Sequence, residues 1–349
     1  MSQKTTEEAN TKPVFTAKDL KTDQDIRWCP GCGDYSILKQ VQTVLPEFEL
    51  NKEDIVFVSG IGCSSRFPYY LDTYGMHSIH GRATSIATGL KAGQPDLSVW
   101  VVTGDGDLLS IGGNHFAHIL RRNPDVNILL FNNEIYGLTK GQYSPTSEAG
   151  KETKSTPFGS VDRPFNPLNL ALGAGASFVA RTMDRDPKHL QETLRQAVAH
   201  KGTSLIEIYQ NCNIFNDGAF FAFSEKESKP EETVYLEEGK PLIYGHNEDK
   251  GIVIDGLKGK TVSLENGYSP DDLMVHDPYD SDKASLLVRF FDDLNDPERR
   301  PRPFGLIYKE ERPTYEDELH EQLQQATERK GEGDLDALLK GQNYWVIEE

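Results

Sequence analysis

The sequence predicts an α/β fold: a doubly wound parallel sheet followed by an irregular, acidic C-terminal extension. Between residues 26 and 212, short apolar runs alternate with helical patterns, and this βαβα order is typical of a parallel sheet with helices on both faces. Beyond residue 224 the pattern weakens, and Glu, Asp, Pro and Gly predominate. We therefore expect a polar N-terminal arm over 1–25, a main domain over 26–224, and an extension over 225–349 that wraps the core or a partner.

The expected elements follow in chain order. Pro187 suits a first helical turn, and Asp186 before it can cap that helix. In the extension we expect only a short apolar run at 251–255 and one clear helix at 315–329. The apolar runs predict strands at 55–59, 99–103, 127–132, 177–181 and 204–209, and the helical patterns predict helices at 34–45, 82–93, 112–122 and 187–200.

Charge and composition exclude several classes of protein. The chain has 349 residues and a formal net charge of −18. Residues 225–349 hold 31 acidic and 16 basic side chains, which argues against a nucleic-acid-binding protein because such proteins carry basic surfaces. No apolar run approaches the roughly 18 residues of a membrane span, and the N-terminus lacks the apolar core of a secretory signal. We expect a cytoplasmic protein that binds neither membrane nor nucleic acid.

A glycine-rich turn follows the second expected strand. Residues 98–103 lead into Gly104-Asp-Gly-Asp107, and a helical stretch follows over 108–122. Glycine lets the backbone approach a phosphate closely, and the N-terminus of the next helix points amides toward it. Gly104, Asp105, Gly106 and Asp107 are therefore candidate cofactor-binding residues. Alone, this turn is also compatible with an ordinary tight connection between strand and helix.

The next expected strand ends in Asn132-Asn133, with 25 residues between Gly106 and Asn132. One βαβ crossover takes about this length, so both strand ends should meet at the carboxyl edge of the sheet. The Asp105 carboxylate, the Asn133 amide oxygen and the Ile135 carbonyl could then serve as ligands of a Mg²⁺ ion that bridges a diphosphate. This combination resembles the diphosphate-binding signature of thiamine-diphosphate enzymes.

The chain has four cysteines. Cys29 and Cys32 form a Cys-Pro-Gly-Cys loop, Cys63 follows the first expected strand, and Cys212 follows the last. If these strand ends share one edge, the sulfurs can converge there. Cys₄ ligation suits a [4Fe–4S] cluster, but spacing alone also allows a structural zinc or unligated thiols.

Taken together, these features resemble the beta subunits of 2-oxoacid:ferredoxin oxidoreductases, through about residue 224. The resemblance implies thiamine diphosphate with Mg²⁺, Gly137 and Leu138 as further cofactor-binding residues, a [4Fe–4S] cluster on Cys29, Cys32, Cys63 and Cys212, and coenzyme A as co-substrate. The matching stretches are Trp28-Cys-Pro-Gly-Cys-Gly33, Gly60-Ile-Gly-Cys-Ser-Ser65, His80-Gly-Arg-Ala83, Gly104-Asp-Gly-Asp107, Gly113-Asn-His115 and Tyr136-Gly-Leu-Thr-Lys-Gly-Gln142.

The resemblance also implies what the enzyme does and what it lacks. The reaction is the oxidative decarboxylation of a 2-oxoacid to an acyl-CoA, with electrons passing through the cluster to ferredoxin. The acidic tail and the His-Gly-Arg-Ala run favour 2-oxoglutarate, with succinyl-CoA as product. Thiamine enzymes use an activating glutamate on a second domain, and neither is evident here. We therefore expect an alpha subunit to supply both, in an αβ or (αβ)₂ heterodimer.

Cations near the site are candidates for binding the substrate carboxylates. Arg66 lies three residues after Cys63, and Lys140 lies seven after Asn133. His80, Arg82 and His115 are weaker candidates, because a histidine in a turn or cap is the ordinary interpretation.

Other functions stay open from the sequence. A non-oxidative thiamine decarboxylase subunit of the sulfopyruvate or phosphonopyruvate kind would need the diphosphate site but no cluster. The substrate could instead be pyruvate. A non-catalytic assembly or regulatory subunit would have no need of the Asp105 and Asn133 pair.

Overall fold

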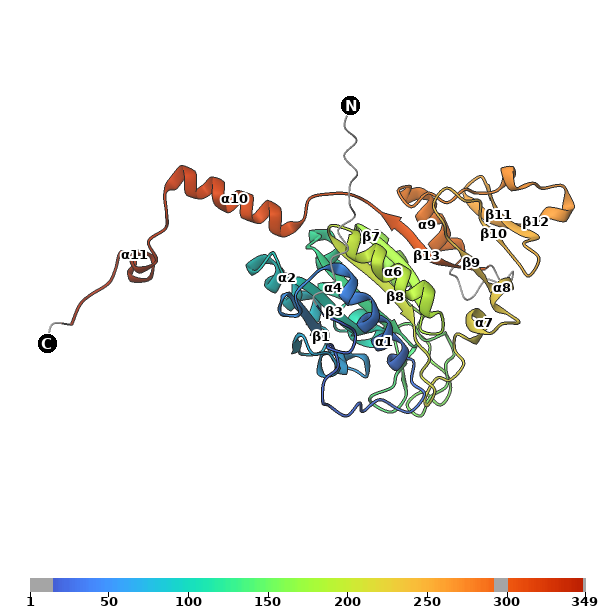
Figure 1. Cartoon of the computed structure of the whole chain (residues 1–349), viewed down its shortest axis with the longest axis horizontal. Coiled ribbons are helices and arrows are strands. Elements are labelled where there is room, and N and C mark those ends of the chain that lie inside the picture. The colour runs from blue at the N-terminus through green and yellow to red at the C-terminus, as the bar shows by residue number, and fades with distance from the viewer. Residues whose placement is uncertain (1–14, 292–300, 348–349) are drawn as a thin grey trace, which may run out of the picture.

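The central feature of the computed structural model, which describes residues 15–291 and 301–347, is an eight-stranded sheet (Figure 1). Its strand order is β2-β1-β3-β4-β8-β7-β13-β9. All neighbouring strands are parallel except β7 and β13. The strands are β1 (Ile55–Ser59), β2 (Tyr74–His77), β3 (Ser98–Gly104), β4 (Val126–Asn132), β7 (Phe178–Met183), β8 (Thr203–Tyr209), β9 (Thr233–Tyr235) and β13 (Arg302–Lys309).

Helices cover both faces of this sheet, so the doubly wound fold predicted from the sequence is confirmed. In β3, Val99 and Val101 face one hydrophobic core while Trp100 and Val102 face the other. α1 (Asp34–Val44) and α6 (Pro187–Ala199) pack on the Trp100 side. The opposite side is covered by α2 (Ala83–Gly93), α4 (Gly113–Arg122), α5 (Pro167–Gly173) and α9 (Ser281–Phe290).

The carboxyl ends of four parallel strands place the site. β1, β3, β4 and β8 lie side by side in the sheet, so the loops that follow them emerge at one edge. A two-stranded hairpin of β5 (Ile135–Tyr136) and β6 (Gln142–Tyr143) follows β4. The expected strands and helices of the main domain are present, with ends shifted by a residue or two.

The helical stretch expected over 108–122 is divided. α3 (Asp105–Leu109) begins within the glycine-rich turn itself, and α4 begins at Gly113. The break lies at Gly112, where an added Cβ would stand 2.5 Å from the Asp107 carbonyl oxygen. The turn between the two helices is therefore too tight for a side chain.

The segment after residue 224 contains more regular structure than expected. β13 pairs antiparallel with β7, and β9 pairs parallel with β13, so both extend the main sheet. A separate three-stranded sheet is formed by β10 (Ile243–Tyr244), β11 (Lys250–Asp255) and β12 (Lys258–Ser263). Figure 1 shows the arm of α10 (Tyr315–Lys330) and α11 (Leu335–Lys340) projecting from the body. The short helices α7 (Phe221–Ser224) and α8 (Lys229–Glu232) link β8 to β9.

The described part of the N-terminal arm packs on the core. Phe15 and Leu20 are buried among the residues around α1, and Lys21 forms an antiparallel bridge with Leu71. Two apolar anchors thus hold a polar segment in place, and the rest of the expected arm, residues 1–14, lies outside the described residues. Within 15–291 and 301–347, no helix has the length and apolar content needed to cross a lipid bilayer.

Candidate active site

A cavity of about 1130 Å³ opens at the carboxyl edge of the sheet. Its lining joins four loops that are far apart in sequence, those after β1, β2, β3 and β4. The sequence-predicted residues that line it are His80, Gly104, Asp105, Gly106, Asp107, Asn133, Ile135, Gly137 and Leu138, together with the cysteine Cys63. All eight residues predicted to bind the cofactor therefore meet at one cavity.

Asp107 holds the loops of this cavity together. Its carboxylate accepts hydrogen bonds from the backbone N–H groups of Ile61 (3.0 Å) and Gly81 (2.7 Å) and from the Thr103 hydroxyl (2.8 Å). The His80 ring nitrogen Nδ1 lies 2.5 Å from the same carboxylate. With this many partners, the buried Asp107 positions the loops and the His80 ring rather than offering oxygens to a ligand.

Asp105 has a different environment. Its buried carboxylate accepts a hydrogen bond of 2.6 Å from the Thr146 hydroxyl, and burial raises its pKa. The same hydroxyl lies 2.9 Å from the Asn132 amide oxygen. No cation is paired with Asp105 among the described residues, so a bound metal ion would stabilise its charged form.

The loop after β4 adds neutral oxygens beside Asp105. Asn133 donates from its amide to Gln210 (2.8 Å), and its amide oxygen accepts from the Ile135 N–H at 3.2 Å. In the described residues, no three His, Cys, Asp or Glu side chains gather as a metal site. A Mg²⁺ ion would thus depend on Asp105, the amide and carbonyl oxygens of Asn133 and Ile135, and oxygens of its ligand, which is the donor set that Mg²⁺ prefers.

Tyr136 begins a stretch that matches the family, but its pattern in the sequence indicates no role for it. Its hydroxyl donates to the Gly106 carbonyl at 3.0 Å, and a Cβ on Gly106 would stand 2.2 Å from its ring. The ring therefore packs directly on the glycine-rich turn and explains why residue 106 has no side chain. Thr146 was not identified from the sequence, because its contact with Asp105 spans 41 residues of the chain.

The structure brings the cysteines to the same edge. A Cβ on Gly137 would lie 3.5 Å from the Cys212 sulfur and 3.7 Å from the Cys63 sulfur. The Cys32 sulfur accepts a hydrogen bond from the Gln210 amide at 3.3 Å. All four cysteines are free thiols.

Burial raises the pKa of the Cys63 thiol to about 12 and also raises the pKa of Cys32. Neutral thiols at these positions become thiolate ligands only when metal ions compensate the charge. In a four-iron cluster each iron takes one cysteine, so the ligands need not meet at a single ion as they do around zinc. The Cys63 and Cys212 sulfurs beside Gly137 and the Cys32 sulfur beside Gln210 are the donor atoms that such a cluster takes.

The other predicted cations lie outside the cavity lining. The Arg66 guanidinium donates to the Tyr70 hydroxyl at 2.9 Å and lies over the rings of Tyr69 and Tyr70. Lys140 is exposed in the turn between β5 and β6, with φ at 83°. Arg82 donates to the Ile111 carbonyl at 3.2 Å. His115 lies in α4, where partial burial and Arg82 lower its pKa.

The carboxylates of the cavity and the apolar side chains around it indicate that another chain contributes to the site. No glutamate lines the cavity within the described residues; its carboxylates are Asp105, Asp107 and Asp162. Large apolar side chains are exposed around it: Leu138 and Phe165 in the lining, and Phe158 (100% exposed) and Val161 (95%) in the loop that leads to Asp162. Exposed apolar surface of this kind marks an interaction site.

Comparison with known proteins identifies the family. Residues 60–208 match the model of the thiamine pyrophosphate enzyme C-terminal TPP binding domain. The chain is 52% identical over 333 residues, 95% of its length and 88% of the relative, to the 2-oxoglutarate oxidoreductase subunit KorB of Mycobacterium tuberculosis. The chain belongs to the 2-oxoacid:ferredoxin oxidoreductase beta-subunit family. The resemblance inferred from the motifs is confirmed.

Other members of this beta-subunit family match to different extents. 2-Oxoacid:ferredoxin oxidoreductase 1 subunit beta of Aeropyrum pernix is 47% identical over 190 residues, which cover 54% of this chain and 60% of that one. The structure of the 2-oxoglutarate:ferredoxin oxidoreductase from Magnetococcus marinus, solved with 2-oxoglutarate, coenzyme A and succinyl-CoA bound, aligns with a TM-score of 0.73 and 32% identity. That alignment covers 95% of this chain and 97% of the other.

Proposed function

We propose that this beta subunit acts in a 2-oxoglutarate:ferredoxin oxidoreductase, which converts 2-oxoglutarate and coenzyme A to succinyl-CoA and carbon dioxide and passes electrons to ferredoxin. One observation carries the proposal: Asp105 and Asn133 of the diphosphate site and the cysteine Cys63 line the same cavity. Electrons can leave the substrate directly only if the electron acceptor lies next to the site of decarboxylation, as residues that line one cavity do.

The residues present fit thiamine diphosphate with Mg²⁺. Gly104 leaves room for the diphosphate against the start of α3, since the nearest atom to a Cβ added there would be the Ser64 hydroxyl at 3.6 Å, and Asp105, Asn133 and Ile135 would hold the metal. Thiamine diphosphate supplies a carbanion that adds to a 2-oxo carbon and stabilises the charge left when carbon dioxide departs. Tyr136 and Asp107 keep the turn in the shape that admits it.

The thiols fit a [4Fe–4S] cluster held by Cys29, Cys32, Cys63 and Cys212. Such a cluster accepts one electron at a time and can hand each to ferredoxin. Gln210 joins the two halves of the site, since it contacts both Cys32 and Asn133 through hydrogen bonds. Its amide orients the metal-binding loop and the cysteine loop together.

The chain's own cations contribute to binding of the substrate. His80 lines the cavity, and its Nδ1 donates to the Asp107 carboxylate, so Nε2 of the neutral ring is left as an acceptor for a proton-bearing group of the substrate or cofactor. Arg66 and Lys140 stay as proposals for carboxylate binding; neither lines the cavity in this chain alone.

A partner completes the site. The exposed Phe158 and Val161 and the lack of a lining glutamate in the described residues both support an alpha subunit that covers the cavity and brings the activating carboxylate. We propose an αβ or (αβ)₂ assembly on this basis.

The test is anaerobic co-purification with the alpha subunit, followed by a panel of 2-oxoacids with coenzyme A and a viologen acceptor. We expect coenzyme-A-dependent dye reduction with 2-oxoglutarate and a brown protein that absorbs near 400 nm. A preference for pyruvate over 2-oxoglutarate would contradict the proposal that 2-oxoglutarate is the substrate. Carbon dioxide release without dye reduction, from protein free of iron, would establish the non-oxidative alternative. The beta subunit alone should show neither activity.

A further inference from the structure

The side-chain amide of Gln210 donates a hydrogen bond to a cysteine sulfur. Its Nε2 lies 3.3 Å from the Cys32 sulfur and 2.6 Å from the Asn211 carbonyl oxygen. A primary amide has two N–H groups, so one can point at the sulfur while the other points at the carbonyl. Gln210 is only 2% exposed, and water therefore competes little for either bond.

The direction of this amide is determined by its oxygen end. The backbone N–H of Ile135 donates to the Asn133 amide oxygen at 3.2 Å, so Asn133 turns its NH₂ group toward Gln210, whose Oε1 accepts at 2.8 Å. Reversing the Gln210 amide would bring two NH₂ groups together and place an oxygen against the sulfur. The orientation with an N–H toward Cys32 is therefore the one that satisfies the buried polar groups.

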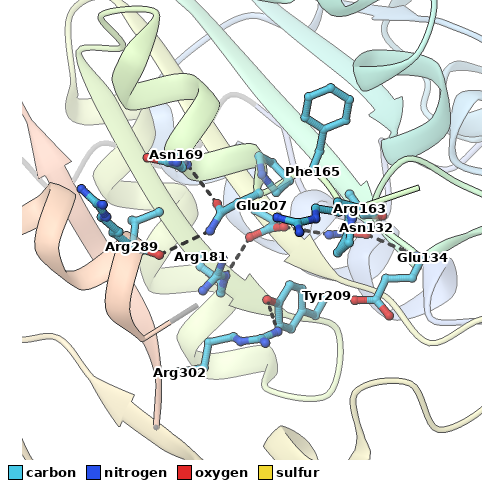
Figure 2. A pocket seen from close by; sticks show the side chains of 15 residues that line it. Asn132, Glu134, Arg163, Phe165, Asn169, Arg181, Glu207, Tyr209, Arg289 and Arg302 are labelled. Atoms are coloured by element: carbon cyan, nitrogen blue, oxygen red, sulfur yellow. Dashed lines mark hydrogen bonds and ion pairs between the residues drawn. The ribbon is translucent and has the colours of Figure 1, made fainter. Parts of the chain in front are cut away.

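The backbone beneath Gln210 is held at the end of the sheet. Its N–H donates to the Asn132 carbonyl at 2.9 Å, which continues the pairing of β4 with β8. Figure 2 shows the buried side chains that join these strand ends: Asn132 donates to Glu207 at 2.8 Å, and Glu207 accepts from Nε of Arg181 at 2.7 Å. The Gln210 side chain thus starts from a fixed backbone position.

We propose that Gln210 raises the reduction potential of the iron–sulfur cluster through its N–H bond to Cys32. The inference rests on the proposed function, since it needs a cluster that Cys32 ligates. Reduction adds one negative charge to such a cluster, and an N–H group aimed at a ligand sulfur stabilises that charge. A higher potential favours uptake of an electron from the thiamine site.

Gln210 serves the two halves of the site with different atoms. Its Oε1 holds Asn133 of the proposed metal site, and its Nε2 faces Cys32. Loss of the N–H group should therefore change the potential of the cluster, whereas loss of the oxygen should change the affinity for thiamine diphosphate. Substitutions can separate these two effects.

The experiment is a redox titration of the anaerobically purified αβ holoenzyme, with electron paramagnetic resonance as the readout. Gln210→Leu removes both the N–H groups and the oxygen without adding a charge. We expect the equilibrium constant for cluster reduction to fall about tenfold, which for a one-electron couple lowers the midpoint potential by about 59 mV. The affinity for thiamine diphosphate should also fall, by about tenfold or more, with iron content unchanged.

Gln210→Glu separates the two atoms. At about pH 8.5 the carboxylate is ionised, so it accepts a hydrogen bond from Asn133 but cannot donate one to Cys32. We expect a midpoint potential at least as low as that of Gln210→Leu, with an affinity for thiamine diphosphate within about threefold of wild type. A potential that falls in Gln210→Glu but not in Gln210→Leu would be an effect of the added charge alone and would overturn the proposal.

Asn213→Leu is the matched control. Asn213 also donates to the loop of Cys29 and Cys32, at 2.7 Å, but its acceptor is the Pro30 carbonyl rather than a sulfur. The midpoint potential of this variant should equal that of the wild type. Equal falls in Asn213→Leu and Gln210→Leu would assign the effect to the shape of the loop and overturn the proposal, as would unchanged potentials in both Gln210 variants.

A second measurement needs no variant. Wild-type holoenzyme labelled with ¹⁵N in its glutamine side-chain amides should show a ¹⁵N coupling to the reduced cluster in pulsed electron paramagnetic resonance. Its absence would contradict the bond from Gln210 to Cys32, even if Gln210→Leu failed to assemble. Wild-type holoenzyme that contains no iron would instead refute the proposed function itself.

Discussion

The diphosphate loop and the cysteine loops occupy the same edge of the sheet, but this chain completes them to different degrees. In the diphosphate loop, Asp107 has four hydrogen-bond partners and Asp105 is held by Thr146. The sulfurs lie on three separate loops, and burial raises the pKa of Cys63 and Cys32. The first region is organised before its ligand arrives, whereas the second needs metal ions to join it.

This difference predicts independent responses to mutation. Gln210 links Cys32 to Asn133, but within the described residues no hydrogen bond joins the Cys29 sulfur to the diphosphate loop, so loss of the Cys29 thiolate should leave thiamine binding intact. Loss of a loop carboxylate should remove the thiamine cofactor but leave iron bound.

The largest effect is expected from Asp105→Ala. The variant loses a direct ligand to a hard cation, and outer-shell changes alone cost 10- to 100-fold in metal affinity. We expect retention of thiamine diphosphate to fall by more than about 100-fold, with iron content unchanged, as measured by cofactor and iron analysis of the αβ complex. Unchanged thiamine content would contradict the assignment of the metal site.

Cys29→Ser should give the reverse result. We expect the cluster to be lost or converted to a three-iron form, and reduction of ferredoxin to stop, while the affinity for thiamine diphosphate stays within about twofold of wild type. Iron analysis and electron paramagnetic resonance would measure the first, and fluorescence titration the second. Simultaneous loss of both cofactors would show that the two regions depend on each other.

Asp107→Asn should have a smaller effect. An amide can accept fewer of the four hydrogen bonds, and each buried donor left unsatisfied costs about 1–3 kcal/mol. We expect a fall in kcat of roughly 10- to 100-fold together with a lower Tm, because His80 and the loops after β1 and β2 lose their shared partner. A variant with normal kcat and Tm would show that Asp107 does not organise the site.

The smallest effect concerns acid stability, far from the site. Burial lowers the pKa of His189 to about 4, below its ordinary 6.5, so the folded state binds fewer protons than the unfolded state between these pH values. Protonation of His189 therefore does not lower the free energy of unfolding above pH 6.5. Below that pH the free energy of unfolding declines as the pH falls toward 4, and the loss is about 2 kcal/mol at pH 5.

His189→Gln should lose less Tm between pH 7.5 and pH 5 than the wild type does, by a few degrees in differential scanning fluorimetry. His246→Gln, which changes an exposed histidine, should behave like the wild type. Identical acid sensitivity in all three proteins would rule out the contribution of His189.

The sequence predicted the parts of the site that depend on local pattern. The glycine-rich turn, the Asn133 loop and the expected strands were all recognisable because each is contained in one short segment. The roles of Thr146 and Tyr136 could not be predicted, since they come from contacts with Asp105 and Gly106, which lie more than a helix away in the chain. β13 was missed for a similar reason: a single strand after an irregular acidic stretch shows no periodicity that reveals which strand it will join.

Because β13 pairs with β7 but lies far after it in the chain, the main sheet is completed late in synthesis. β7 hydrogen-bonds to β13 along its free side, and the ribosome reaches β13 only after the three-stranded sheet and α9. Until then β7 is the edge of a nearly finished parallel sheet, and an exposed edge strand invites pairing with another chain. A nascent or truncated protein that ends near residue 224 should therefore need chaperone protection, whereas release of the full-length chain lets its own last strand cover that edge.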